Sequence, residues 1–400
     1  AIYLDDGCYG FADTSGDFKI FDSDKKPFNK APTALSKDKG YAQKGGYRFF
    51  MEKEIYEQSA VASECLMGRI SGDEVCLDID ESVLKGKDEV LLCACGTSYH
   101  AALSASYLLE RLAKIRTKVE IASEFRYKSP FLNKNALFVA ISQSGETADT
   151  LEALKIAKNA GLKSLAICNV DNSSIVRLAD AVLLTRAGIE KGVASTKAFA
   201  TQVLVLWLLA LRLAKMRNTL SPSEFNRETE ALRGIPAVLN FSPALQERIY
   251  RICKHYLHGH GFFFIGRDIF YPLALEGALK LKEISYLHAE GYPSGEMKHG
   301  PIALADSGLY TIALLPSTCL YDKASSNAQE LAARDAFITA ISPEPFELAD
   351  DYIATSKHSH MMSEFFEMMV VLQLLALEIS VRLGNDVDMP RNLAKSVTVE

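Results

Sequence analysis

The sequence predicts an α/β protein made of two tandem copies of one three-layer αβα sandwich, each with a parallel sheet, followed by a C-terminal tail. Short apolar runs alternate with stretches of helical periodicity, which is typical of parallel strands covered by helices on both faces. The same order of runs and helices occurs twice, which indicates an internal duplication. With 400 residues, 48% hydrophobic and 24% charged, the chain has the length of two or three globular domains.

Charge and cysteine usage exclude several classes of function. The chain has 44 Lys and Arg against 50 Asp and Glu, a net charge of −6 without a basic block, so we expect no nucleic-acid partner and no anionic membrane. The longest apolar stretch, around 203–211, is too short to span a bilayer. The eight cysteines are scattered, which favours free thiols in a cytoplasmic protein. Cys93 and Cys95 form an isolated C-x-C pair, and we predict no metal site there.

Residues 1–46 differ from the rest of the chain. Glycines punctuate short aromatic pieces such as 18–22, which predicts strands and turns, and 27–46 is polar with scattered Gly and Pro, which predicts a linker. The chain begins with Ala1, and its first residues lack the cationic and apolar parts of a signal peptide. We therefore expect that this sequence starts inside a longer chain.

The first sandwich is predicted over 47–225 and begins with the helical spacing of 49–67. Its predicted strands are 90–95, 119–121, 136–141, 164–168 and 181–184, and its predicted helices are 100–112 and 148–159. Residues 200–250 are mostly helical and connect the two copies.

The second sandwich is predicted over 226–384, and the tail over 385–400. Its predicted strands are 261–265, 309–315 and 336–341, and its predicted helices are 271–286 (with Pro272 at its first position), 324–334 and 361–383. Two acidic and aromatic segments, 122–127 and 289–296, are expected to correspond between the copies.

The strongest local motif is SQSGET, which follows a predicted strand and opens a predicted helix. A helix N-terminus at the carboxyl edge of a parallel sheet suits a phosphate group. Ser142, Ser144 and Thr147 add hydroxyls, Gln143 adds an amide, and Gly145 lets the backbone approach a ligand. A simple N-cap is the alternative, but a cap needs only one hydroxyl. We therefore favour phosphate binding, and the absence of Gly-rich nucleotide motifs argues against ATP and dinucleotides.

Two further turns carry small hydroxyl residues. Thr97 and Ser98 follow the first predicted strand and should lie at the same sheet edge as SQSGET, although a tight capped turn explains them equally well. Residues 192–198 (GVASTKA) have the same character, and the alternative is a loop that enters the following helix.

Three charged residues share one face of the predicted helix 271–286. Glu276 and Lys280 are spaced i,i+4, and Lys280 and Glu283 are spaced i,i+3. A solvated ion-pair face is the ordinary interpretation. Because the helix follows a buried strand at the ligand-facing edge, we favour a role in which one carboxylate acts as a general base.

His299 and Lys395 are candidates for proton transfer and for a covalent step. Imidazole is suited to proton transfer near neutral pH, although an isolated loop histidine is the default interpretation of His299. Lys395 lies in the tail, where fraying is the default, but the alternating apolar residues around it favour docking. A lysine in an apolar site can form a Schiff base with a carbonyl substrate. The remaining paired histidines, 255, 258, 260, 358 and 360, are expected in polar loops.

Taken together, the motifs CGTSYHAA, EIASEFRY, SQSGETADTL, GVASTKAF, ALEGALKLKEISYLHAEGYPSGEMKHGP and VDMPRNLAKSVTVE resemble the glutamine–fructose-6-phosphate aminotransferases over roughly residues 47–400. The duplicated unit resembles the sugar isomerase (SIS) domain, a flavodoxin-like sandwich. The resemblance implies binding of hexose phosphates (fructose-6-phosphate, glucosamine-6-phosphate and glucose-6-phosphate) and amination at C2 without a metal or organic cofactor. It also implies a homodimer with a shared active site.

The resemblance assigns roles to individual residues. Lys395 would form the Schiff base, Glu283 would move a proton between C1 and C2 with Lys280 nearby, and His299 would open the sugar ring from the partner subunit. The substrate-binding residues would be Thr97, Ser98, Ser142, Gln143, Ser144, Thr147, Val193, Ser195 and Arg391.

The resemblance fails at the front of the chain. Residues 1–22 are similar only to the last strands of the family's glutaminase domain, and Cys8 is not placed as its nucleophile, so we expect that this chain lacks a glutaminase active site. A phosphosugar isomerase without amination and a non-enzymatic sugar-phosphate sensor remain as alternatives. The lysine-bearing tail argues against the isomerase, and the lack of a basic DNA-binding segment argues against the sensor.

Overall fold

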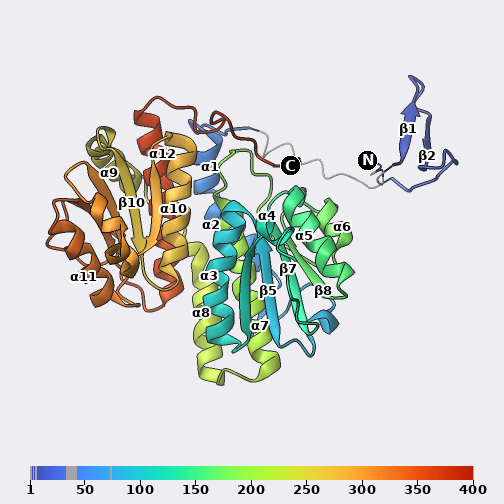
Figure 1. Cartoon of the computed structure of the whole chain (residues 1–400), viewed down its shortest axis with the longest axis horizontal. Helices are drawn as coiled ribbons and strands as arrows, with labels where there is room; N and C mark the ends of the chain where they lie inside the picture. The colour runs from blue at the N-terminus through green and yellow to red at the C-terminus, as the bar shows by residue number, and fades with distance from the viewer. Residues whose placement is uncertain (1, 3, 5–6, 33–42, 73, 400) are drawn as a thin grey trace. The chain divides into compact units, whose positions relative to one another are not determined.

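The computed structural model divides the chain into a small unit, residues 1–43, and a large unit, residues 44–400 (Figure 1). It describes all residues except 1, 3, 5–6, 33–42, 73 and 400. In the small unit, β1 (Tyr9–Ala12) and β2 (Phe18–Phe21) pair as an antiparallel hairpin, which confirms the strand predicted at 18–22. Much of the predicted linker falls on 33–42, outside the described residues.

The first sheet of the large unit is parallel throughout, with the strand order β6-β5-β7-β8-β9. Its strands are β5 (Glu89–Ala94), β6 (Arg116–Ile121), β7 (Ala136–Ser142), β8 (Lys163–Cys168) and β9 (Ala181–Leu184). On one face lie α3 (Gly96–Leu112) and α7 (Lys197–Arg217), and on the other lie α4 (Ala122–Phe125), α5 (Ala148–Asn159) and α6 (Ser174–Leu178). Every residue of β5 and β7 is buried, as a central strand covered on both faces requires.

The second sheet repeats this topology, with the strand order β11-β10-β12-β13-β14 and parallel pairing throughout. Its strands are β10 (Gly261–Gly266), β11 (Ala289–Pro293), β12 (Leu309–Leu314), β13 (Phe337–Ser342) and β14 (Asp351–Ala354). The helices α10 (Phe270–Ser285) and α12 (Met361–Arg382) cover one face, and α11 (Tyr321–Ala332) covers the other. The predicted duplication is therefore confirmed, and β11 and β14 are strands that the sequence did not predict.

The remaining elements frame the two sandwiches. They are α1 (Phe50–Tyr56), α2 (Gln58–Leu66), β3 (Ile70–Ser71), β4 (Glu74–Val75), η2 (Glu81–Leu84), α8 (Pro222–Val238), α9 (Pro243–Ile252), η3 (Cys253–Leu257), η4 (Ser294–His299) and η5 (Pro301–Leu304), where η denotes a 3₁₀ helix. The helices α7, α8 and α9 confirm that 200–250 is mostly helical. The predicted boundary between the copies, at 225, lies inside α8 and stays a prediction.

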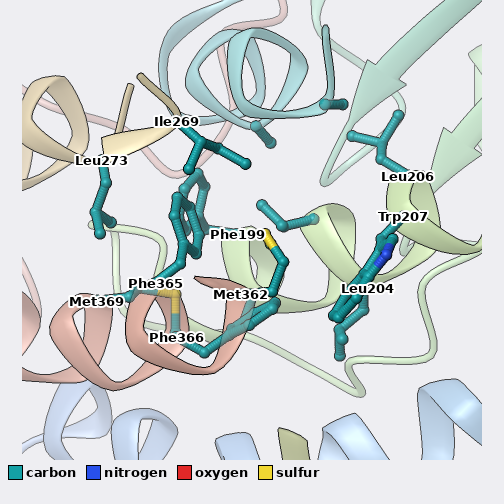
Figure 2. Packing of buried hydrophobic residues seen from close by; sticks show 14 of the residues in the cluster. Phe199, Leu204, Leu206, Trp207, Ile269, Leu273, Met362, Phe365, Phe366 and Met369 are labelled. Carbon is teal, nitrogen blue, oxygen red and sulfur yellow. The ribbon is translucent and has the colours of Figure 1, made fainter. Parts of the chain in front are cut away.

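The two copies share one apolar core. Figure 2 shows Phe199 of α7 beside Phe365 of α12, and their ring centroids are 6.4 Å apart. The Phe365 ring also contacts Phe270 of α10 at 6.1 Å. Because this core continues from one sheet to the other, α3 of the first copy packs against α10 of the second. That contact brings side chains from both copies to one place.

Two sequence predictions are wrong in detail. Residues 122–127 and 289–296 do not correspond, because Ala122–Phe125 is a helical turn after β6, whereas Ala289–Pro293 is the edge strand β11 itself. Pro272 is the third residue of α10, since the helix begins at Phe270.

The apolar stretch at 203–211 lies inside α7, a helix of 21 residues. By length and composition alone α7 could cross a membrane, but most of its apolar window is buried inside the fold, where it packs against α2 and α3. Burial among other helices explains why this helix is apolar on all sides.

Candidate active site

A cavity of about 200 Å³ opens at the carboxyl ends of β5 and β7. The N-termini of α3 and α5 point toward it from the first copy, α10 contributes from the second copy, and the C-terminal tail covers one side. The lining residues are Cys95, Gly96, Thr97, Ser98, Gln143, Ser144, Thr147, Val193, Ser195, Lys280, Glu283, Leu393, Ala394, Lys395, Ser396 and Val397. Most of the residues singled out in the sequence therefore meet in one cavity.

The SQSGET turn is held in shape by its own hydroxyls. Ser142 is buried beneath the turn, where its Oγ accepts a hydrogen bond from the Gly145 N–H at 3.0 Å and lies 3.0 Å from Thr147 Oγ1. Gly145 has a φ of +68°, and a Cβ there would lie 1.9 Å from Ser173 Oγ, so only glycine fits. Ser144 and Thr147 line the cavity directly, while Ser142 acts from below.

Thr97 and Ser98 lie in the first turn of α3, which begins at Gly96, four residues earlier than predicted. Ser98 is nearly buried and its Oγ accepts a hydrogen bond from Gln202 Nε2 at 3.0 Å. The N-terminus of α3 and that of α5 thus face the same cavity, and both provide the partial positive charge that favours an anion.

The charged face of α10 is buried, not solvated. Lys280 is 1% exposed, and its Nζ lies 2.7 Å from Glu283 Oε2, 3.4 Å from Glu276 Oε1 and 2.9 Å from Thr97 Oγ1. On its other side, Glu276 contacts His100 Nδ1 at 2.7 Å. Burial by itself lowers the pKa of Lys280, but the two glutamates outweigh it and hold that pKa above the ordinary value. Lys280 therefore remains a cation, and Glu283 is the α10 carboxylate that lines the cavity.

The C-terminal tail docks at the cavity, in agreement with the alternating apolar pattern. Ser396 Oγ lies 3.0 Å from Ser144 Oγ, and the Val397 carbonyl accepts a hydrogen bond from the Ala148 N–H at the start of α5. The Lys395 side chain enters the cavity, where its Nζ donates to the Gly192 carbonyl at 2.8 Å and to Ser195 Oγ at 3.2 Å. An amine is thus fixed beside the hydroxyl-lined turns.

Two buried glutamates behind Lys395 were missed by the sequence analysis. Glu190 Oε2 lies 2.5 Å from Lys395 Nζ, and its side chain has no exposed surface. Burial raises the pKa of Glu190, but the Lys395 ammonium and backbone N–H donors outweigh burial and hold it below its ordinary value. Glu54 of α1 binds the neighbouring backbone, and burial, reinforced by the Glu190 charge, raises the pKa of Glu54 to about 7. Glu190 lies two residues before the GVASTKA segment, but nothing in its spacing distinguishes it from a surface glutamate.

Besides Ser142, which lies beneath the SQSGET turn, two predicted site residues lie outside the cavity lining. His299 is exposed in η4 on the second copy. Arg391 stacks on Tyr286, with its guanidinium carbon 4.2 Å from the ring centroid, and its N–H donates to the Tyr286 hydroxyl. Arg391 thus anchors the start of the tail. Val193 lines the cavity and donates its N–H to the Asp388 carbonyl at 3.3 Å, which ties the loop to the tail.

The equivalent turn of the second copy is closed by a side chain of the protein itself. Ser317 and Thr318 follow β12 just as Ser144 and Gly145 follow β7. Their backbone N–H groups donate to the Glu364 carboxylate at 3.1 and 3.0 Å, and their hydroxyls donate to it at 2.5 Å. Glu364 is completely buried in the first turn of α12. A carboxylate therefore occupies in the second copy the position that faces the open cavity in the first.

Four of the other histidines pair with acids away from this cavity. His255 contacts Asp351, His260 contacts Asp306, His358 contacts Glu367 and His360 contacts Glu228. Within the described part of the chain, no group of three or more His, Cys, Asp or Glu is arranged to hold a metal ion.

Comparisons with known proteins give this geometry a context. The SIS domain family matches residues 83–212 and 258–378. Proteins named glutamine–fructose-6-phosphate aminotransferase (isomerizing) are 63% identical in Campylobacter jejuni, over all of this chain and 66% of the relative, and 57% identical in Helicobacter pylori, over 89% of this chain and 60% of the relative. The chain thus spans about three fifths to two thirds of the length of these curated relatives.

A solved structure matches closely as well. It is the C-terminal domain of glucosamine-fructose-6-phosphate aminotransferase from Francisella tularensis, with a TM-score of 0.83 and 40% identity over 87% of this chain and 100% of that one. The two matched segments are the two sandwiches described above. The chain therefore belongs to the SIS domain family, carries two copies of the domain, and is similar to the C-terminal domain of that aminotransferase.

Proposed function

We propose that this chain binds a hexose 6-phosphate in the first-copy cavity and converts the ketose fructose-6-phosphate into an aldose by way of a Schiff base, with amination at C2. The observation that carries the proposal is the amine of Lys395, fixed inside a cavity whose other walls are hydroxyls and two helix N-termini. A sugar phosphate needs an anion site at one end and a reactive group at its carbonyl, and this cavity offers both.

The phosphate would lie at the SQSGET turn. Gln143, Ser144 and Thr147 supply polar groups there, and the α5 N-terminus favours negative charge. The rest of the sugar chain would meet Thr97, Ser98 and the loop of Val193 and Ser195, which places its carbonyl toward Lys395.

Glu283 would carry the proton between C1 and C2 of the imine. Its carboxylate lines the cavity and contacts the Lys280 ammonium at 2.7 Å, which holds the carboxylate in place at the wall of the cavity. Lys280 keeps its own proton, because its neighbours are acidic, and would stabilise negative charge that develops on the substrate.

His299 would open the sugar ring from a partner subunit of a homodimer, since in its own chain it is exposed and outside the cavity. Ammonia for the amination would come from glutamine hydrolysed by another domain, and the product would be glucosamine-6-phosphate, a precursor for amino-sugar and UDP-N-acetylglucosamine synthesis. Such a reaction belongs in the cytoplasm, where hexose phosphates are found.

Borohydride trapping tests the proposal. With fructose-6-phosphate and borohydride, intact-mass analysis of the wild type should show one added hexose phosphate. Lys395→Ala should show none, while Lys357→Ala, an exposed lysine paired with Glu344, should behave as wild type. A full adduct on Lys395→Ala would contradict the proposal.

Product analysis separates the alternatives. Glucose-6-phosphate as the product even with ammonia supplied would favour a non-aminating isomerase, and binding without any conversion would favour a sensor. Rapid formation of glucosamine-6-phosphate from glutamine by this chain alone would contradict the expectation that the ammonia comes from another domain.

A further inference from the structure

The Lys395 amine is held by a carboxylate that has no access to solvent. The Glu190 side chain accepts hydrogen bonds from the Thr196 N–H at 2.9 Å, the Ala198 N–H at 3.0 Å and Ser195 Oγ at 2.9 Å, besides its contact with Lys395. The backbone at the start of α7 thus fixes the position of the Glu190 carboxylate, which contacts the Lys395 amine directly.

A second buried carboxylate stands behind the first. Glu54 is 2% exposed and accepts hydrogen bonds from the Lys191 N–H at 2.5 Å and the Gly192 N–H at 3.2 and 3.3 Å. Gly192 links the two sites, because its carbonyl accepts from Lys395 Nζ while its N–H donates to Glu54. A Cβ on Gly192 would lie 2.9 Å from Glu54 Oε2, so this close approach depends on glycine.

Other charges on the surrounding elements are engaged in pairs. Around α1, Asp388 pairs with Lys44 at 3.1 Å, and Glu57 pairs with Lys197 at 2.8 Å. Across the cavity, Lys280 of α10 adds positive charge that is compensated by Glu276 and Glu283. The charges that act directly on Glu54 are those of Glu190, which disfavours its ionisation, and of Lys395, which favours it.

We propose that Glu54 and Glu190 act as one buried proton acceptor, which stores Lys395 as an ammonium in the empty cavity and takes its proton when the amine attacks the sugar carbonyl. The inference rests on the proposed function, because it concerns the step in which Lys395 forms the imine. Neither glutamate lines the cavity. Glu190 contacts the reacting Lys395 Nζ directly, whereas Glu54 is a positioning residue that acts through the charge of Glu190.

The step balances in atoms and charge. An ammonium has no lone pair, so one proton passes from Nζ to the carboxylate pair before the nitrogen attacks. The lone pair then forms the C–N bond, and the π electrons of the carbonyl move to its oxygen. The two remaining Nζ protons go to that oxygen, which leaves as water when the C=N bond forms. Ammonium, carboxylate and ketone thus give a neutral imine, a carboxylic acid and water.

Two carboxylates accept a proton more readily than one. After the transfer, Glu190 holds the proton and the pair keeps one negative charge, which relieves the repulsion between two buried anions. Glu190 alone, surrounded by N–H donors, would be a weak base, and Glu54 raises the basicity of the pair. The pH at which Glu54 ionises, about 7, is therefore expected to appear in the rate of imine formation.

The test is the pH dependence of imine formation in single turnovers with fructose-6-phosphate, quenched with borohydride between about pH 5.5 and about pH 9. In the wild type, the rate should rise through an acid limb near pH 7. In Glu54→Gln, the rise in rate near pH 7 should disappear. The maximal rate at high pH should fall about tenfold for each pKa unit by which the remaining carboxylate is less basic than the pair. Glu54→Asp, which keeps the charge, should keep the limb, and Glu64→Gln, an exposed glutamate on α2, should match the wild type.

The outcomes separate the inference from the proposed function. Glucose-6-phosphate binding should be equal in wild type and Glu54→Gln, which shows that the cavity is intact. A trapped imine with a flat pH profile in the wild type, or a Glu54→Gln profile with an unchanged acid limb, overturns the inference alone. The wild-type profile decides even if Glu54→Gln fails to fold. Absence of any trapped imine in the wild type contradicts the proposed function, and the inference falls with it.

Discussion

Replacing Glu364 with alanine should turn the closed turn of the second copy into an open anion site. The substitution removes the carboxylate that accepts the N–H groups of Ser317 and Thr318. A donor left without a partner costs about 1–3 kcal/mol, and because Thr318 is exposed, water will replace part of the loss. We expect the free energy of unfolding to fall by about 2–4 kcal/mol.

Inorganic phosphate should recover part of this loss, since it can occupy the space and accept the same N–H groups. A ligand at ten times its Kd stabilises the folded state by about 1.4 kcal/mol. Thermal melts of wild type and Glu364→Ala over a phosphate series measure the effect as a shift in Tm. The shift should be larger in Glu364→Ala than in the wild type, in which phosphate is proposed to bind at the first-copy turn.

Glu364→Gln is the matched control for this experiment. It loses the charge but fills the same space, so it should be destabilised without gaining a response to phosphate. If Glu364→Ala responds to phosphate no more than the wild type, then Glu364 is a structural cap of the turn, and the reasoning that it replaces a bound anion is wrong.

Three further changes have defined outcomes. Ser144→Ala removes a hydroxyl from the proposed phosphate site and should weaken glucose-6-phosphate binding, measured by calorimetry, about tenfold, whereas Ser317→Ala should leave it unchanged. Gly145→Ala must hold a φ of +68° and place its Cβ 1.9 Å from Ser173 Oγ, so it should lower Tm and hexose-phosphate affinity together. Glu54 has its pKa raised from 4.5 to about 7, so the stability that it contributes is present in full below pH 4.5 and is lost as the pH rises through 7. Denaturant unfolding should therefore show that Glu54→Gln gains up to about 3 kcal/mol relative to wild type between pH 5 and pH 8, and an equal difference at both pH values would contradict the raised pKa.

The strands and helices were largely predictable because each copy alternates fully buried strands with amphipathic helices. β5 and β7 are apolar throughout and covered on both faces, so their period and length identify them. β14 was missed because DYIA is a short edge strand with alternating burial, a pattern that many loops share. The predicted correspondence of 122–127 with 289–296 was wrong because the two segments share only their composition. The first is the helical turn after a strand, and the second begins with the strand itself.

The candidate site was predictable where a motif carries its own geometry. SQSGET needs only a preceding strand and a following helix to form its turn, and both could be read from the sequence. Glu190 and Glu54 carry no such local pattern. Their role depends on burial and on a lysine that is distant from both in the chain.

The sequence by itself determined the duplicated α/β architecture and the SQSGET turn between β7 and α5, because these follow from periodicity and from short motifs. Only the tertiary structure decided which copy keeps an open turn, since Glu364 closes the second one from another helix. It also decided that Lys395 meets a buried carboxylate and that the α10 charges are desolvated. The physical reason is that burial and charge pairing depend on what the fold brings together across long sequence separations, and no local pattern records them.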